Sequence, residues 1–224
     1  MTAAVNRDAS AATLSVDGRR VRRVRNREAV VDAMLALYAE GELFPTVVQI
    51  AERAGLSARS LFRYFTDAEE ICQAAVERHL EGKRTPIPSL EPQPNSTSDR
   101  IVCFVRHRLD LYEAYGQTFR AGRLHAARSA AVAETLDQFR AEMRGQAIGY
   151  FADDLSGVEP RERSTIASQV ALVGTFETID ALRQQQGLSR RATERTLVSL
   201  LTRILAVDPP SSELTCEVAV GGCS

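Results

Sequence analysis

The 224-residue sequence has no apolar run of the length that a membrane-spanning helix needs, which is about 20 residues. Its N-terminus has no apolar stretch followed by small residues, so we expect no secretory signal peptide. These absences favour a cytoplasmic protein that does not enter a membrane. The apolar fraction of 44% is ordinary for a globular chain and allows a sizeable core.

Cysteine and histidine are scarce, and neither shows the spacing of a metal site. The cysteines form no C-x-x-C pair, so free buried or surface thiols are favoured over a zinc site or a disulfide framework. The sequence also lacks a phosphate-binding loop, a nucleophile elbow and a dinucleotide-binding glycine pattern. We therefore expect no metal, no cofactor and no enzyme activity, although a helical enzyme remains an alternative. The residues concerned are Cys72, Cys103, Cys216, Cys223, His79, His107 and His125.

Charge is balanced overall but concentrated locally. The net charge of -1 argues against a protein that coats nucleic acid indiscriminately. Six arginines nevertheless occupy the nine positions 19–27 with no acid among them, namely Arg19, Arg20, Arg22, Arg23, Arg25 and Arg27. This cluster is either a flexible arm that follows the minor groove of DNA or a solvated surface.

The pattern along the chain predicts an all-α protein. Residues 1–18 are small and polar, which predicts disorder, and residues 19–81 have helical periodicity in short pieces. The prolines of residues 82–97 indicate a linker. Long helical patterns resume over 98–207, and 208–224 form a flexible tail. No β-rich stretch with hairpin turns and no repeat period is evident. We expect a small N-terminal domain and a larger C-terminal one.

The small domain begins with a predicted helix over 21–40, ended by Gly41. Its apolar face is formed by Val30, Ala33, Met34, Leu37 and Tyr38. Thr46 and Gln49 have the spacing of a capping box at the start of a short second helix, which buries Ile50 and Ala51.

A tight turn and a third helix follow. Gly55 can adopt the positive φ that the turn needs, and Ser57 is a natural N-cap for a helix from Ala58 to about Phe65. Asp67 and Glu70 repeat a capping pattern before a fourth helix. Two short helices joined by such a turn form a helix-turn-helix. The third helix exposes Arg59, Ser60 and Arg63, whose donors suit phosphates and base edges, although a generic helical bundle has the same spacing.

The segment 44–79, FPTVVQIAERAGLSARSLFRYFTDAEEICQAAVERH, resembles the DNA-binding domain of the TetR family of transcriptional repressors. The resemblance is carried by Thr46, Ile50-Ala51, Ala54-Gly55-Leu56-Ser57 and Leu61-Phe62-Arg63-Tyr64-Phe65. It implies that Thr46 contacts phosphate, that Arg59 and Ser60 face base edges, and that Phe62, Arg63 and Tyr64 touch backbone or bases. With the arginine cluster, the predicted DNA-binding set is Thr46, Ser57, Arg59, Ser60, Phe62, Arg63, Tyr64, Arg22, Arg23 and Arg25.

Two positions depart from the family pattern. Phe62 is often tyrosine in the family, and phenylalanine cannot donate a hydrogen bond to phosphate. The family also often has a phosphate-binding lysine near Asp67 or Ala68, where this sequence has none. The arginine cluster is the candidate source of the missing charge.

In the larger domain we predict helices over 98–115, with a cap at Ser98-Asp99, and over 117–127, 130–154, 160–186 and 190–207. The last two are long and joined by the short turn at Gly187. The resemblance implies that they form the four-helix interface of a homodimer, with Leu197, Leu200, Leu201 and Ile204 as interface residues. A dimer would place two recognition helices about one DNA turn apart.

The resemblance also implies a cavity for an unknown small-molecule inducer that releases the repressor from a palindromic operator. The candidate lining residues are Phe104, His107, Leu111, Phe119, Phe139, Met143, Tyr150, Phe176 and Glu177. Simple core packing is the alternative for each of them. His107 and Glu177 would need polar partners if buried, and a ligand could be one. An architectural or protein-binding helical module without an inducer remains the alternative to the repressor.

Overall fold

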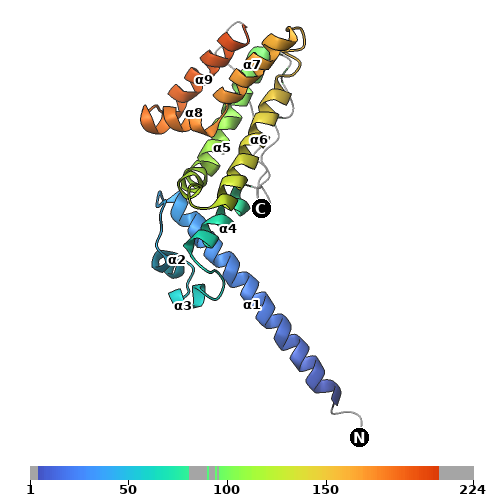
Figure 1. The fold of residues 1–224 in the computed structure, drawn as a ribbon, viewed down its shortest axis with the longest axis vertical. Coiled ribbons are helices and arrows are strands. Elements are labelled where there is room, and N and C mark those ends of the chain that lie inside the picture. Colours follow the sequence, from blue (N-terminus) through green and yellow to red (C-terminus); the bar gives the residue numbers. More distant parts are fainter. Residues whose placement is uncertain (1–4, 81–89, 91–93, 95, 207–224) are drawn as a thin grey trace. The chain divides into compact units, whose positions relative to one another are not determined.

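The computed structural model describes residues 5–80, 90, 94 and 96–206, with side chains from Arg20 onward (Figure 1). All regular structure in these ranges is helical, which confirms the predicted fold class. The elements are α1 (Val5–Ala39), α2 (Val47–Arg53), α3 (Ala58–Leu61), α4 (Ala68–Leu80), α5 (Thr97–His125), α6 (Ala130–Tyr150), α7 (Pro160–Val173), α8 (Phe176–Asp180), the π-helical turn η1 (Ala181–Gln185) and α9 (Arg190–Ile204).

The chain divides into two compact units that interleave along the sequence. The first unit combines the residues up to Arg78 with Arg120–Ala133, and the second combines His79–Phe119 with the residues from Glu134 onward. The sequence predicts two consecutive domains with a linker at 82–97, most of which lies outside the described residues. The end of α5 and the start of α6 instead belong to the first unit. The predicted tail at 208–224 lies outside the described residues.

The core of the first unit is built on the apolar face of α1. The predicted face, Val30, Ala33, Met34, Leu37 and Tyr38, is buried along its whole length. Buried side chains from the other helices pack in the same unit, namely Ile50, Ala51, Leu61, Phe65, Ile71, Cys72, Ala75 and Val76. The period-3.6 pattern of the sequence therefore identified this core correctly.

Helix α1 begins at Val5, well before the predicted start at residue 21. This corrects the prediction of disorder for residues 5–18, and it also corrects the flexible arm, because Arg20–Arg27 lie within the helix. A helix that has already nucleated extends by one hydrogen bond per residue, and no proline interrupts this stretch. The lack of an apolar period in the sequence of this stretch therefore does not exclude a helix.

The second unit differs from prediction at α5, which is one helix where two were predicted. Gly116 does not break it. A side chain at Gly116 would meet the ring of Tyr112, one turn earlier, at 3.2 Å, so the glycine makes room for that ring. The next helix, α6, ends at Tyr150 rather than at the predicted residue 154, and turns follow to Gly157.

The predicted helix over 160–186 is broken at Gly174, so that α7, α8 and η1 replace it. A Cβ atom at Gly174 would lie 2.7 Å from Cζ of Phe104 on α5, a distance that real Cβ contacts do not reach. Thr175 then starts α8 by accepting the backbone N–H of Thr178 at 3.2 Å. The break thus follows from close packing of α5 against a helix distant in sequence.

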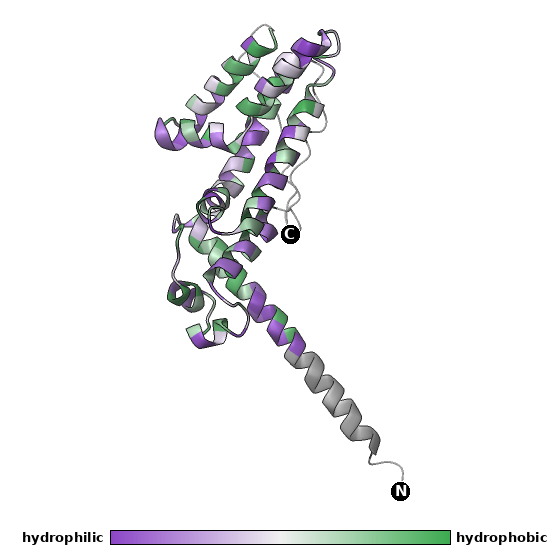
Figure 2. Cartoon of the chain, in the orientation of Figure 1, coloured by the Kyte–Doolittle hydropathy of each residue, from purple (hydrophilic) through white to green (hydrophobic). Residues whose placement is uncertain are grey.

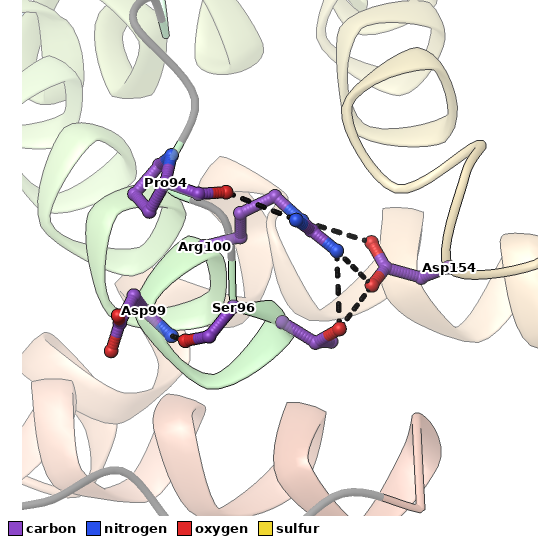
Figure 3. A network of polar contacts seen from close by, with 6 residues as sticks. Pro94, Ser96, Asp99, Arg100 and Asp154 are labelled. Carbon is purple, nitrogen blue, oxygen red and sulfur yellow. Dashed lines mark hydrogen bonds and ion pairs between the residues drawn. The ribbon is translucent and has the colours of Figure 1, made fainter.

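A polar network fixes the start of α5 to the segment after α6 (Figure 3). Arg100 donates through Nε to Asp154 at 3.2 Å and through Nη1 to the Pro94 carbonyl at 3.0 Å. Thr97 also donates to Asp154. The N-cap is Ser96, whose Oγ accepts the backbone N–H of Asp99 at 3.1 Å, and not the predicted Ser98-Asp99.

The described cysteines differ from each other. Cys72 is free and buried, as expected, whereas Cys103 takes part in a disulfide. The prediction of free thiols was therefore wrong for Cys103, because the lack of a C-x-x-C pair does not exclude a disulfide. In the described ranges no helix has the length and apolarity to cross a bilayer, and no group of side chains there could hold a metal ion.

Candidate nucleic-acid interface

The helix-turn-helix is held by the predicted caps. The backbone N–H of Gln49 donates to Thr46 Oγ1 at 3.3 Å, and the Thr46 N–H donates to Gln49 Oε1 at 2.7 Å, which completes the capping box. Gly55 has a φ of +68°, where a side chain would be strained. Ser57 Oγ accepts the backbone N–H of Ser60 at 3.2 Å and starts α3. The predicted capping box, the positive φ of Gly55 and the Ser57 N-cap are thus confirmed.

Helix α3 is shorter than predicted and ends at Leu61 instead of Phe65. Beyond it the chain tightens, because the N–H groups of Arg63 and Tyr64 donate three residues back, to Ser60 and Leu61, at 3.2 and 2.9 Å. The N–H of Phe65 returns to the Leu61 carbonyl at 3.2 Å. Residues 58–65 therefore stay helically coiled, with a single α-turn followed by a tighter one. We call residues 57–65 the recognition segment.

The recognition segment is sharply two-sided. Leu61 and Phe65 are buried, as predicted, whereas Arg59, Phe62 and Arg63 are exposed. Thr46 and Ser57 are also exposed, and Ser60 and Tyr64 are half-buried. The seven predicted residues from this part of the chain thus reach the surface at least partly.

Two contacts attach the recognition segment to α1. Asn26 donates through Nδ2 to the Tyr64 hydroxyl at 2.8 Å. The guanidinium of Arg27 lies 4.6 Å from the ring centroid of Phe65, and its Nη2 is 3.6 Å from Glu70 Oε1. Arg27 therefore stabilises the first unit through its contacts with Phe65 and Glu70. Asn26 orients Tyr64, a role that no local pattern of the sequence predicts.

Just before Asn26, α1 and the recognition segment enclose a cleft of about 680 Å³ lined by Arg22, Arg23, Arg63 and Tyr64. Arg25 is exposed on α1 but does not line this cleft. The first coloured turns of α1 in Figure 2, which begin at Arg20, are mainly hydrophilic. Three guanidinium groups and a phenol in one cleft form a site for an anion such as a phosphate.

These cations have no acidic partners among the side chains that the structure describes. Ion pairs form there for Arg27, Arg53 and Arg78, each with a carboxylate of the same unit. None is found for Arg22, Arg23, Arg25, Arg59 or Arg63 within the same set of residues. The positive charge of the cleft and of the recognition segment is thus left uncompensated.

Comparison with known proteins places this arrangement in a recognised fold. No protein-family model and no curated protein sequence matches the chain. Solved structures do match it. A transcriptional regulator from Rhodococcus sp. Rha1 is 19% identical, with a TM-score of 0.58, over 82% of this chain and 96% of that one. A TetR-family transcriptional regulator from Streptomyces coelicolor is 17% identical, with a TM-score of 0.55, over 82% of this chain and 90% of that one.

The fatty acid degradation regulator FadR from Bacillus halodurans is 16% identical, with a TM-score of 0.51, over 78% of this chain and 93% of that one. The likeness covers both units. The chain has the fold of the TetR-family transcriptional regulators. At these identities the likeness establishes the fold alone.

In the second unit of this TetR-type fold, eight of the nine candidate ligand-binding residues are buried. Aromatic rings dominate this region, as in the contacts of Phe176 with Phe119 at 5.0 Å and with Phe139 at 5.2 Å between ring centroids. Glu177 is half-buried and pairs with Arg140 at 2.8 Å, so it has a protein partner. Burial fits a ligand-lined cavity and a simple core equally well, so the assignment stays a prediction.

Arg108, which is not among the residues predicted from the sequence, lies with them on α5 and is only 1% exposed. Burial lowers the pKa of Arg108 to about 10, which leaves its guanidinium protonated at neutral pH. A signal was available: Arg108 follows Phe104 by one helical turn on the apolar face that contains Val105 and Leu109.

The four predicted dimer residues of α9 separate into two kinds. Leu197 and Leu201 are buried within the protomer, whereas Leu200 is 40% exposed and Ile204 is half-buried. Leu172 on α7 is 64% exposed. The first pair therefore belongs to the core, and only Leu200 and Ile204 keep surface for a second subunit.

Proposed function

We propose that this chain is a DNA-binding transcriptional regulator that binds a palindromic operator as a homodimer and represses until a small molecule releases it. It acts in the cytoplasm and has no catalytic role. The observation that carries the proposal is the uncompensated positive surface formed by the recognition segment and the cleft beside it. The fold, shared with transcriptional regulators, supports the same function.

Base recognition is assigned to the exposed side of the recognition segment. A guanidinium can donate two hydrogen bonds to the major-groove edge of guanine, which makes Arg59 the main reading residue. Ser60 lies beside it, with an Oγ that accepts from Ser57 Oγ at 2.9 Å. Phe62 is 52% exposed and offers apolar contact to a thymine methyl group or the sugar-phosphate backbone.

Phosphate contacts are assigned to Thr46 and to the cleft. Thr46 is exposed at the start of α2, where its hydroxyl donates to Gln49 Oε1 at 2.7 Å, and a phosphate oxygen would compete for that proton. Arg22 and Arg23 project from a helix and not from a loose arm, so we assign them to the backbone that flanks the major groove. Contacts of this kind set register and affinity and carry little sequence information.

The second unit supplies dimerisation and control. Leu172 and Leu200, exposed on α7 and α9, offer apolar surface to a second copy. A bound ligand favours one arrangement of the dimer and operator DNA favours the other, so the two binding events oppose each other. Release from DNA is then a shift of the population toward the arrangement that binds the ligand.

The test starts from selection of binding sites out of random double-stranded DNA with the full-length protein. We expect a palindrome with a dissociation constant of about 10⁻⁸ M or tighter at physiological salt, and random DNA bound about 10³-fold more weakly or worse. Equal affinity for both would favour an architectural role.

Two variants locate the interface. Arg59→Ala should relax preference at one base position of each half-site, whereas Thr46→Ala should weaken all sequences alike. Arg144→Ala, which removes an exposed arginine from the second unit, is the control and should leave binding unchanged. Retention of both affinity and preference in Arg59→Ala contradicts the assignment of the recognition segment.

A further inference from the structure

The most unusual group in the second unit is the buried guanidinium of Arg108. Its Nη2 donates to the Met143 carbonyl oxygen at 2.9 Å, and its Nη1 reaches only the Met143 thioether sulfur, at 2.7 Å. The Phe104 ring covers one face, with its centroid 4.7 Å from the guanidinium carbon. The Nε atom is buried and has no hydrogen-bond partner.

No carboxylate offsets this charge among the residues that the structure describes. Other arginines of the same unit do have acidic partners, as Arg100 has Asp154 and Arg140 has Glu177. A buried cation without an anion is costly, and a carbonyl, a sulfur and a ring face compensate it only in part. A methionine at this position would fill a similar volume without the free-energy cost of burying a charge.

We propose that Arg108 binds the carboxylate of an apolar small molecule, which would be the effector of the regulator; this inference rests on the proposed function. The carboxylate supplies the negative charge and the acceptor that Nε lacks. The surrounding rings determine the rest of the ligand. Phe104 lies 5.9 Å from Tyr150 and 5.2 Å from Phe151 between ring centroids, so these packed rings offer apolar contact to a ligand body that parts them.

The carboxylate reaches Nε by displacing a neighbouring side chain. Nε lies 3.4 Å from the position that a Cβ of residue 174 would take, and the Phe104 ring fills the space on that side, at 2.7 Å from the same position. Met143 is unbranched and flexible, and its sulfur is a weak acceptor that a carboxylate oxygen readily replaces. The site therefore lies where α5, α6 and the α7–α8 break meet within one unit.

Calorimetry on the full-length protein tests the proposal with two matched pairs, decanoate against decanamide and 2-naphthoate against 2-naphthamide. Each pair keeps the apolar body and changes only the charge. We expect the wild type to bind at least one acid about 10-fold or more tightly than its amide, because a hydrogen bond to a charged group exceeds a neutral one. Arg108→Met should bind acid and amide alike, Arg108→Lys should keep part of the preference, and Arg144→Met should keep all of it.

The unliganded variant gives an independent measurement. Arg108→Met should melt no lower than the wild type, because it replaces an uncompensated buried charge by an apolar group. Equal binding of acid and amide by the wild type, failure of both acids to bind, or an unchanged preference in Arg108→Met would each overturn the proposal. These outcomes leave operator binding intact, whereas failure of the proposed function appears as absence of a selected DNA site.

Discussion

The cleft beside the recognition segment makes a quantitative prediction about salt. Arg22 and Arg23 line this cleft with Arg63 and have no acidic partner among the described side chains. In a dimer, the double variant Arg22→Ala/Arg23→Ala removes four guanidiniums. If each neutralises one phosphate, the slope of log affinity against log salt becomes shallower by about 3.6, at about 0.9 for each contact.

The slope converts into affinities that can be measured. Between about 50 and about 200 mM salt, a slope difference of about 3.6 changes the ratio of wild-type to variant affinity about 150-fold. Fluorescence anisotropy with the selected operator gives both slopes. Alanine favours the helix, so circular dichroism should show α1 intact in the variant.

The matched control is Arg144→Ala/Arg161→Ala, which removes two exposed arginines from the second unit. Its slope should equal that of the wild type. An unchanged slope in the Arg22→Ala/Arg23→Ala variant, or an equal decrease in the control, would refute the assignment of the cleft to phosphate and would identify the arginine cluster as a solvated surface.

Three further predictions concern single sites. Gly174→Ala places a Cβ 2.7 Å from Phe104 Cζ and should lower the free energy of unfolding by about 1–3 kcal/mol in urea denaturation; unchanged stability would show that the contact relaxes freely. The Asp154 side chain is 5% exposed and pairs with Arg100, so Asp154→Ala should lower the free energy of unfolding by about 3 kcal/mol. A decrease under about 1 kcal/mol would show that this pair contributes no more than a surface ion pair. Arg59→Ala should reduce discrimination at its base position by about 1–3 kcal/mol in competition binding, and equal losses at every position would make Arg59 a phosphate contact.

The sequence predicted the parts of this molecule that depend on neighbouring residues. The capping box at Thr46, the positive φ of Gly55 and the buried faces of Leu61 and Phe65 follow from local spacing, and the structure has them. The recognition segment could therefore be located before its geometry was known.

Features that depend on distant residues could not be predicted in the same way. Gly116 and Gly174 look alike in sequence, yet the first lies inside α5 and the second ends α7, because only the second meets a ring from another helix. The burial of Arg108 also depends on distant residues. Arginine is almost never fully buried without a partner, so its place on an apolar face of α5 does not by itself predict burial.

Helix α1 is continuous from Arg20, through the contact of Asn26 with Tyr64, to the buried side of Tyr38. The directions in which its side chains point around the helix axis are therefore fixed relative to one another. One alanine added after Arg23 would turn the two arginines before it by about 100° and advance them by about 1.5 Å. A flexible segment would tolerate that insertion. In a continuous helix the insertion turns Arg22 and Arg23 away from Arg63, so the number of residues between these arginines and Asn26 is constrained.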